Sequence, residues 1–79
     1  MKTVYVNLNG ADTVQRFVKT LTALNGDFEL VENNITLDAR SLMGIFSLDL
    51  SHPIMLRVYN ASAENMQAIK PFLEEKTDE

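Results

Sequence analysis

The spacing of apolar residues changes within the first 24 positions of the chain, and this change limits the folds that it can adopt. Residues 2–8 alternate strictly, which predicts a half-buried strand with Val4, Val6 and Leu8 on one face. From Thr13 the period becomes that of an amphipathic helix. The apolar positions of this helix are Val14, Phe17, Val18, Leu21 and Leu24. Asn9-Gly10 separates the two segments, and Asn25-Gly26 is expected to end the helix.

The rest of the chain continues with short strands and helices. Alternation on both sides of Asn33-Asn34 predicts a hairpin, residues 40–50 a short helix, and residues 54–59 a strand. Ser62 is expected to begin a last helix, whose final turn Pro71 disturbs. The inward side chains expected here are Phe28, Leu30, Ile35, Leu37, Ile54, Leu56, Val58, Met66, Ile69 and Leu73. The predicted order is β-α-β-β-α-β-α, an α+β fold with helices packed on one face of a sheet.

Size and charge narrow the possible functions. The 79 residues are expected to form one domain, residues 1–79, because a second domain needs roughly 50 residues of its own. The absence of cysteine favours a reducing, cytoplasmic setting and excludes thiolate metal sites. A net charge of −4 with scattered Lys and Arg disfavours nucleic acid as a partner. No apolar run approaches the ~18 residues of a membrane span, so no membrane association is expected.

Residues 40–50 carry a family resemblance. The run Arg-Ser-Leu-Met-Gly-Ile-Phe-Ser-Leu-Asp-Leu resembles the segment around the regulatory serine of histidine-containing phosphocarrier proteins (HPr), in which a basic residue and a serine precede a short apolar helix. Asn9-Gly10, Phe17-Val18 and residues 59–61 also stand where similar family residues do. The resemblance implies an open-faced β-sandwich with a four-stranded antiparallel sheet, and a protein of the phosphoenolpyruvate-dependent sugar phosphotransferase system type.

The chain departs from this family at the phosphoryl acceptor. Asp12 stands where the phosphorylated histidine is expected, and Val14 and Gln15 replace the family's Arg and Pro. The only histidine, His52, lies about forty residues away. From the residues alone, Asp12 and Gln15 have the spacing of a capping box, so Asp12 is expected to cap the helix rather than to carry phosphate. We therefore expect a protein that is neither a carrier nor an enzyme and needs no cofactor.

Ser41 and the apolar residues after it remain as candidates for function. Ser41 is expected to cap the short helix, and the resemblance implies that a kinase of the HPr kinase/phosphorylase type modifies it. One short helix of so small a domain cannot bury all of its apolar side chains, so Met43 and Phe46 above all are expected to be exposed. The predicted partner-binding residues are Leu42, Met43, Ile45 and Phe46. The same residues can also serve only to close one end of the core.

The expected partners are other proteins. The resemblance implies phosphotransferase-system enzymes, an HPr kinase/phosphorylase or a transcriptional regulator. His52 has no second histidine or cysteine nearby, so it is expected to be a solvated loop residue and no metal site is expected. Two alternatives stay open: a true phosphotransfer component with an unusual acceptor, and an unrelated ferredoxin-like ligand-binding or enzyme domain. An acylphosphatase of the latter fold needs an Arg after the first strand, and residues 7–13 contain none.

Overall fold

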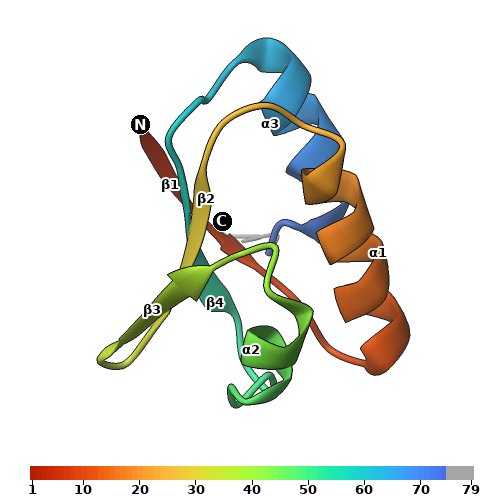
Figure 1. The fold of residues 1–79 in the computed structure, drawn as a ribbon, viewed down its shortest axis with the longest axis vertical. Coiled ribbons are helices and arrows are strands. Elements are labelled where there is room, and N and C mark those ends of the chain that lie inside the picture. Colours follow the sequence, from red (N-terminus) through yellow and green to blue (C-terminus); the bar gives the residue numbers. More distant parts are fainter. Residues whose placement is uncertain (75–79) are drawn as a thin grey trace, which may run out of the picture.

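The structure, a computed structural model, describes residues 1–74 and confirms the predicted order of elements (Figure 1). A 3₁₀ turn, η1, is added after the last helix. The elements are β1 (Lys2–Val6), α1 (Ala11–Thr22), β2 (Phe28–Glu32), β3 (Ile35–Asp38), α2 (Leu42–Phe46), β4 (Ile54–Val58), α3 (Ala63–Ile69) and η1 (Lys70–Phe72). Pro71 acts as expected, because regular α-helix ends at Ile69 and Pro71 lies in η1.

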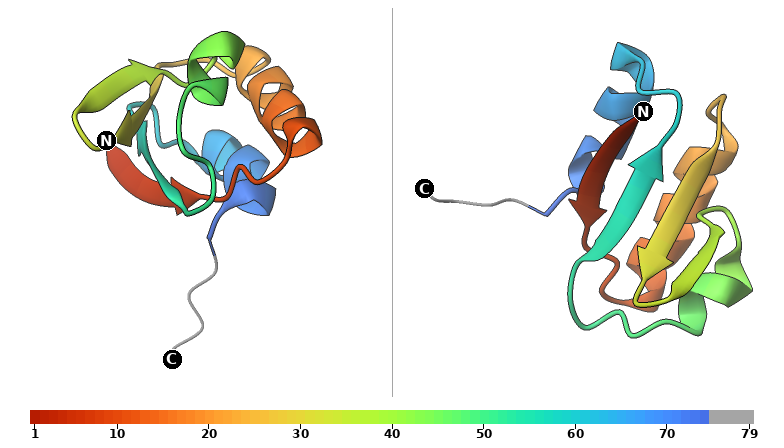
Figure 2. Two further views of the ribbon diagram at one scale, coloured as in Figure 1. Left: turned by 90° about the horizontal axis from the view of Figure 1, so that it is seen from below. Right: turned by 90° about the vertical axis from the view of Figure 1, so that its left-hand side faces the viewer.

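The four strands form one antiparallel sheet in the order β1-β4-β2-β3 (Figure 2). The hairpin is the predicted one: Glu32 pairs with Ile35 across the two-residue turn, and Asn33 takes a positive φ of 55°. The right-hand view of Figure 2 shows the helices behind the sheet and the opposite face of the sheet in front. The outer side of β1 pairs with the chain after η1, because the Asn7 and Glu74 N–H groups donate to the carbonyls of Phe72 and Tyr5.

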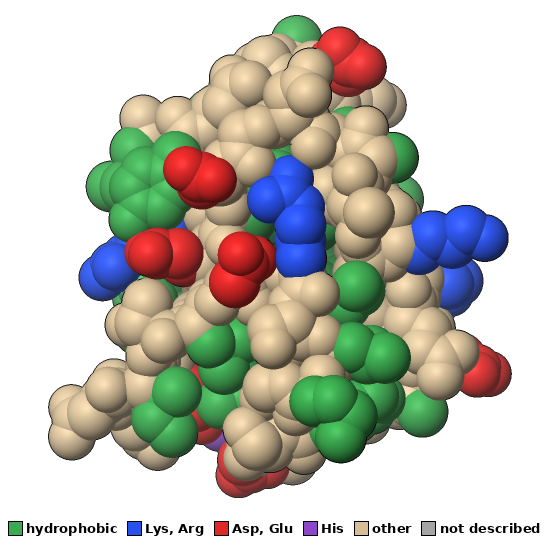
Figure 3. Space-filling model, in the orientation of Figure 1, with side chains coloured by type: hydrophobic (Ala, Val, Ile, Leu, Met, Phe, Trp, Pro, Cys, Tyr) green, Lys and Arg blue, Asp and Glu red, His purple; other side chains and the backbone are tan. Residues whose placement is uncertain are grey.

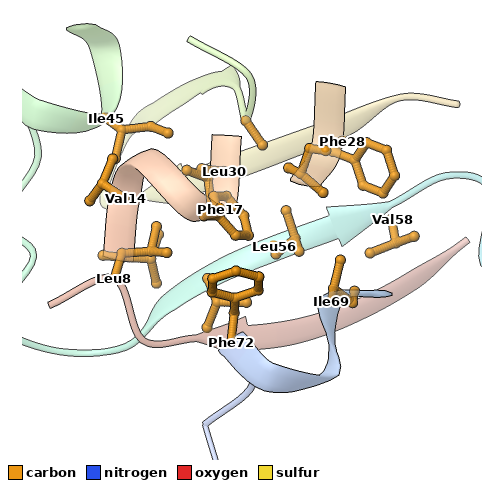
Figure 4. Packing of buried hydrophobic residues seen from close by; sticks show 14 residues of the cluster. Leu8, Val14, Phe17, Phe28, Leu30, Ile45, Leu56, Val58, Ile69 and Phe72 are labelled. Atoms are coloured by element: carbon orange, nitrogen blue, oxygen red, sulfur yellow. The ribbon is translucent and has the colours of Figure 1, made fainter. Parts of the chain in front are cut away.

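The core lies between this sheet and the helices (Figure 4). Almost every apolar position predicted to face inward is buried or packs against the core, including Leu8, which follows the end of β1. Phe72, which the pattern did not reveal, joins them and packs edge-on against Phe17, with 5.3 Å between ring centroids. The expectation for Ile35 is wrong: its side chain is 51% exposed, because it lies at the tip of the edge hairpin.

Candidate functional site

The start of α1, where the resemblance places a phosphoryl acceptor, is built differently from the sequence expectation. The N-cap residue is Gly10, with φ of 99°, and no side chain of residues 1–74 caps the helix. Asp12 is exposed in the first helical turn, so the predicted capping box of Asp12 and Gln15 is wrong. The helix begins at Ala11 because Gly10 supplies the positive φ that turns the chain into it. Asp12 still interacts favourably with the positive end of the helix dipole.

Asp12 lies on a face of α1 that also carries cations. A shallow depression of about 400 Å³ is lined by Asp12, Gln15, Arg16 and Lys19. Arg16, which the sequence analysis did not single out, also lies over the Phe72 ring, 5.9 Å from its centroid. This depression offers a carboxylate and two cations but no imidazole, and His52 lies outside it. Among the described residues, the first turn of α1 therefore presents a carboxylate and no imidazole.

Ser41 occupies the predicted N-cap position of α2, but its hydroxyl does not make the expected bond. The Ser41 carbonyl accepts from the Ile45 N–H at 2.9 Å, while no side chain in the described part of the chain caps the helix. A Cβ placed on Gly44 would lie only 2.9 Å from the Ser41 hydroxyl oxygen, so glycine leaves room for this hydroxyl. Ser41 is exposed, which leaves the hydroxyl accessible to a modifying enzyme.

The apolar residues of α2 divide into an anchor and an exposed group. Ile45 is completely buried and points toward Val14 of α1, so it belongs to the core and cannot contact a partner (Figure 4). Met43 is 79% exposed and Phe46 41%, as expected, and Leu42 is half-buried. We call Leu42, Met43 and Phe46 the α2 surface. Figure 3 shows hydrophobic side chains gathered over this end of the molecule.

Arg40 has a structural role that the sequence did not reveal. Its guanidinium donates to the carbonyls of Leu21, Leu24 and Gly26 at 2.9–3.0 Å and lies over the Phe28 ring. These carbonyls are at the end of α1 and in the turn after it, where a helix leaves acceptors unsatisfied and favours positive charge. Arg40 thus fixes the chain just before Ser41 to the end of α1.

His52 is exposed, as predicted, but it has carboxylate partners. Its Nε2 lies 3.0 Å from Glu32 and 3.8 Å from Asp49. The Pro53 carbonyl beside Nδ1 raises the pKa of His52 above its ordinary 6.5, and Glu32 and Asp49 act in the same direction. Hydrogen bonds from Ser51 lower the pKa of Asp49. No group of three or more His, Cys, Asp or Glu within residues 1–74 is arranged to hold a metal ion.

Comparison with known proteins reveals the fold. No family model matches the chain, and no curated protein sequence matches it. A solved structure, HPr-C-His from Thermoanaerobacter tengcongensis, superposes with a TM-score of 0.74 over 90% of this chain and 89% of that one, at 24% sequence identity. The chain has an HPr-like fold. This agrees with the predicted α+β architecture and favours it over the ferredoxin-like alternative. Within residues 1–74, no helix is long and apolar enough to cross a membrane.

Proposed function

We propose that this protein is an HPr-like, non-carrier module that binds other proteins through the α2 surface. The observation that carries the proposal is the exposure of Met43 and Phe46 on a helix whose Ile45 is fully buried. The buried residue fixes the helix to the core, and the exposed ones present an apolar contact surface. Methionine and phenylalanine also suit contact surfaces, because one adapts its shape and the other offers a large apolar area.

The first turn of α1 supports the non-carrier part of the proposal. A phosphocarrier of this kind needs a neutral imidazole at the helix N-terminus, and this chain has Asp12 there. Transfer to a carboxylate gives an acyl phosphate, which is chemically possible. The described residues near Asp12 form no acidic group suited to the Mg²⁺ that would assist such a transfer.

Phosphorylation of Ser41 is the proposed means of control. A phosphate on this exposed hydroxyl would add about −1.5 to −2 charges beside the α2 surface. It would also lie at the start of α2, where negative charge is favourable. Incubation with an HPr kinase/phosphorylase and ATP tests this step, with a known HPr as positive control. Phosphate on Ser41 supports the proposal, and an unlabelled protein beside a labelled control removes this part of it.

Affinity capture tests the binding function. Wild type, Met43→Asp and Tyr5→Asp are immobilised at equal density and exposed to the phosphotransferase-system enzymes and HPr kinase/phosphorylase in purified form. Tyr5 is 46% exposed on β1, so its substitution adds the same charge to a different exposed hydrophobic residue. We expect Met43→Asp to lose at least about tenfold in affinity for the bound protein, since a charge would then have to be buried. Equal retention by all three would show that the α2 surface is not the binding site.

A further inference from the structure

The charges around the α2 surface indicate which partners it fits. We infer that this surface binds a protein segment that presents apolar side chains flanked by Lys and Arg. The inference rests on the proposed function, since it assumes that the α2 surface is a contact site. It adds the chemistry of the partner, which follows from the distribution of acidic and basic side chains on β2, on β3 and in the loop between α2 and β4.

Carboxylates stand on both sides of α2 along the chain. Asp38 ends β3 four residues before the helix begins, and Asp49 follows three residues after the helix ends. Both residues are exposed, and the side chain of Asp49 is 67% accessible. Glu32 adds a third carboxylate on the Asp49 side, because His52 contacts both of them. The apolar residues of the α2 surface are therefore flanked along the chain by carboxylates, which we call the acidic border.

Cations near these carboxylates are few. Between Asp27 and Leu56 the sequence contains a single Lys or Arg, which is Arg40. Its guanidinium keeps its charge but donates to three backbone carbonyls, and among the salt bridges of residues 1–74 it pairs with no carboxylate. Arg57 pairs with Glu29, at 3.4 Å. Among the salt bridges of residues 1–74, those that involve Asp49 and Glu32 are made with His52. Above its raised pKa the His52 ring is neutral and no longer offsets the charge of Glu32 and Asp49.

A surface with an apolar centre and a charged border prefers partners whose apolar side chains are flanked by the opposite charge. Burial of the apolar side chains supplies the contact energy, while complementary charges at the border speed association and exclude like-charged partners. An acidic border repels nucleic acid and anionic membranes, both of which would otherwise compete. It attracts a segment in which Lys or Arg flank Leu, Ile or Phe.

A matched pair of peptides tests the inference. One is an amphipathic peptide of Leu and Lys, and the other has Glu in place of every Lys. Each is titrated into the ¹⁵N-labelled protein at low salt near pH 8, with the amide shifts followed by NMR. We expect the Lys peptide to shift amides of residues 35–50 and to bind at least about tenfold more tightly than the Glu peptide. Raising the salt should weaken binding of the Lys peptide.

Two double variants show whether peptide binding depends on the acidic border or only on the net charge of the protein. Asp38→Asn with Asp49→Asn keeps the acceptor oxygens that bond to the Arg40 and Ser51 N–H groups, and should weaken Lys-peptide binding about three- to tenfold. Asp12→Asn with Glu64→Gln removes the same charge from α1 and α3 and should have little effect. The inference is overturned if neither peptide binds, if both bind equally, if the shifts lie elsewhere, or if the two double variants weaken binding equally. In each of those cases, weaker binding of Met43→Asp in the affinity-capture experiment would still support the proposed function.

Discussion

Arg40 connects two segments that are distant in sequence, and its removal should be costly. In Arg40→Ala the carbonyls of Leu21, Leu24 and Gly26 lose a charged donor, and the end of α1 loses a favourable cation. We expect the free energy of unfolding to fall by about 2–3 kcal/mol, because water replaces part of what is lost at these partly exposed groups. Urea denaturation measures the change. Arg57→Ala is the control, since its partly exposed pair with Glu29, at 3.4 Å, contributes less than about 1 kcal/mol. Equal losses would contradict the role given to Arg40.

His52 should make the free energy of unfolding depend on pH. Its folded pKa is raised above 6.5, so the charged form bound to Glu32 and Asp49 stabilises the fold below pH 6.5, and this contribution disappears as the pH rises through the folded pKa. The difference in unfolding free energy between wild type and His52→Asn should therefore be larger near about pH 5.5 than near about pH 8.5. NMR titration of the ring gives the pKa directly. A folded pKa at or below 6.5, or a difference that grows with pH, would contradict this prediction.

At the scale of elements, α2 should tolerate substitutions on its exposed side but not on its buried side. Ile45→Ala removes a fully buried side chain that lies against α1, and should lower the free energy of unfolding by about 2–4 kcal/mol. Met43→Ala, two residues away on the exposed side, should change it by less than about 0.5 kcal/mol. Thermal or urea denaturation of the two variants measures both values. If Met43→Ala destabilised the fold as strongly as Ile45→Ala, Met43 would be a core residue and not a contact residue.

The elements themselves could be predicted because their apolar residues recur at periods of 2 or 3.6, and a sheet and helices must both bury one face. Element ends were less predictable. Asp12 and Gln15 fit a capping box by spacing, but the positive φ of Gly10 starts α1 at Ala11 instead. Ile35 alternates correctly with Leu37, yet it is exposed, because its position at the tip of an edge hairpin depends on the whole sheet.

At the scale of the whole molecule, the polar contacts that join distant segments could not be predicted. Arg40 bonds to a carbonyl 19 residues away, and the buried Asn65 donates to the carbonyls of Asn25 and Asn60. Such pairs leave no periodic trace in a sequence, since each depends on segments that meet only after folding. The exposed part of the α2 surface could be predicted, because a small domain cannot cover every side of a short apolar helix.

We propose that this HPr-like fold works without carrying a phosphoryl group, and intact-mass analysis tests the proposal most directly. The protein and a known HPr are incubated in parallel with phosphoenolpyruvate and the first enzyme of the sugar phosphotransferase system. We predict that the HPr gains the mass of one phosphoryl group and that this protein gains none, because the first turn of α1 contains Asp12 and no histidine. A comparable gain on this protein would contradict the claim and would identify an unusual acceptor.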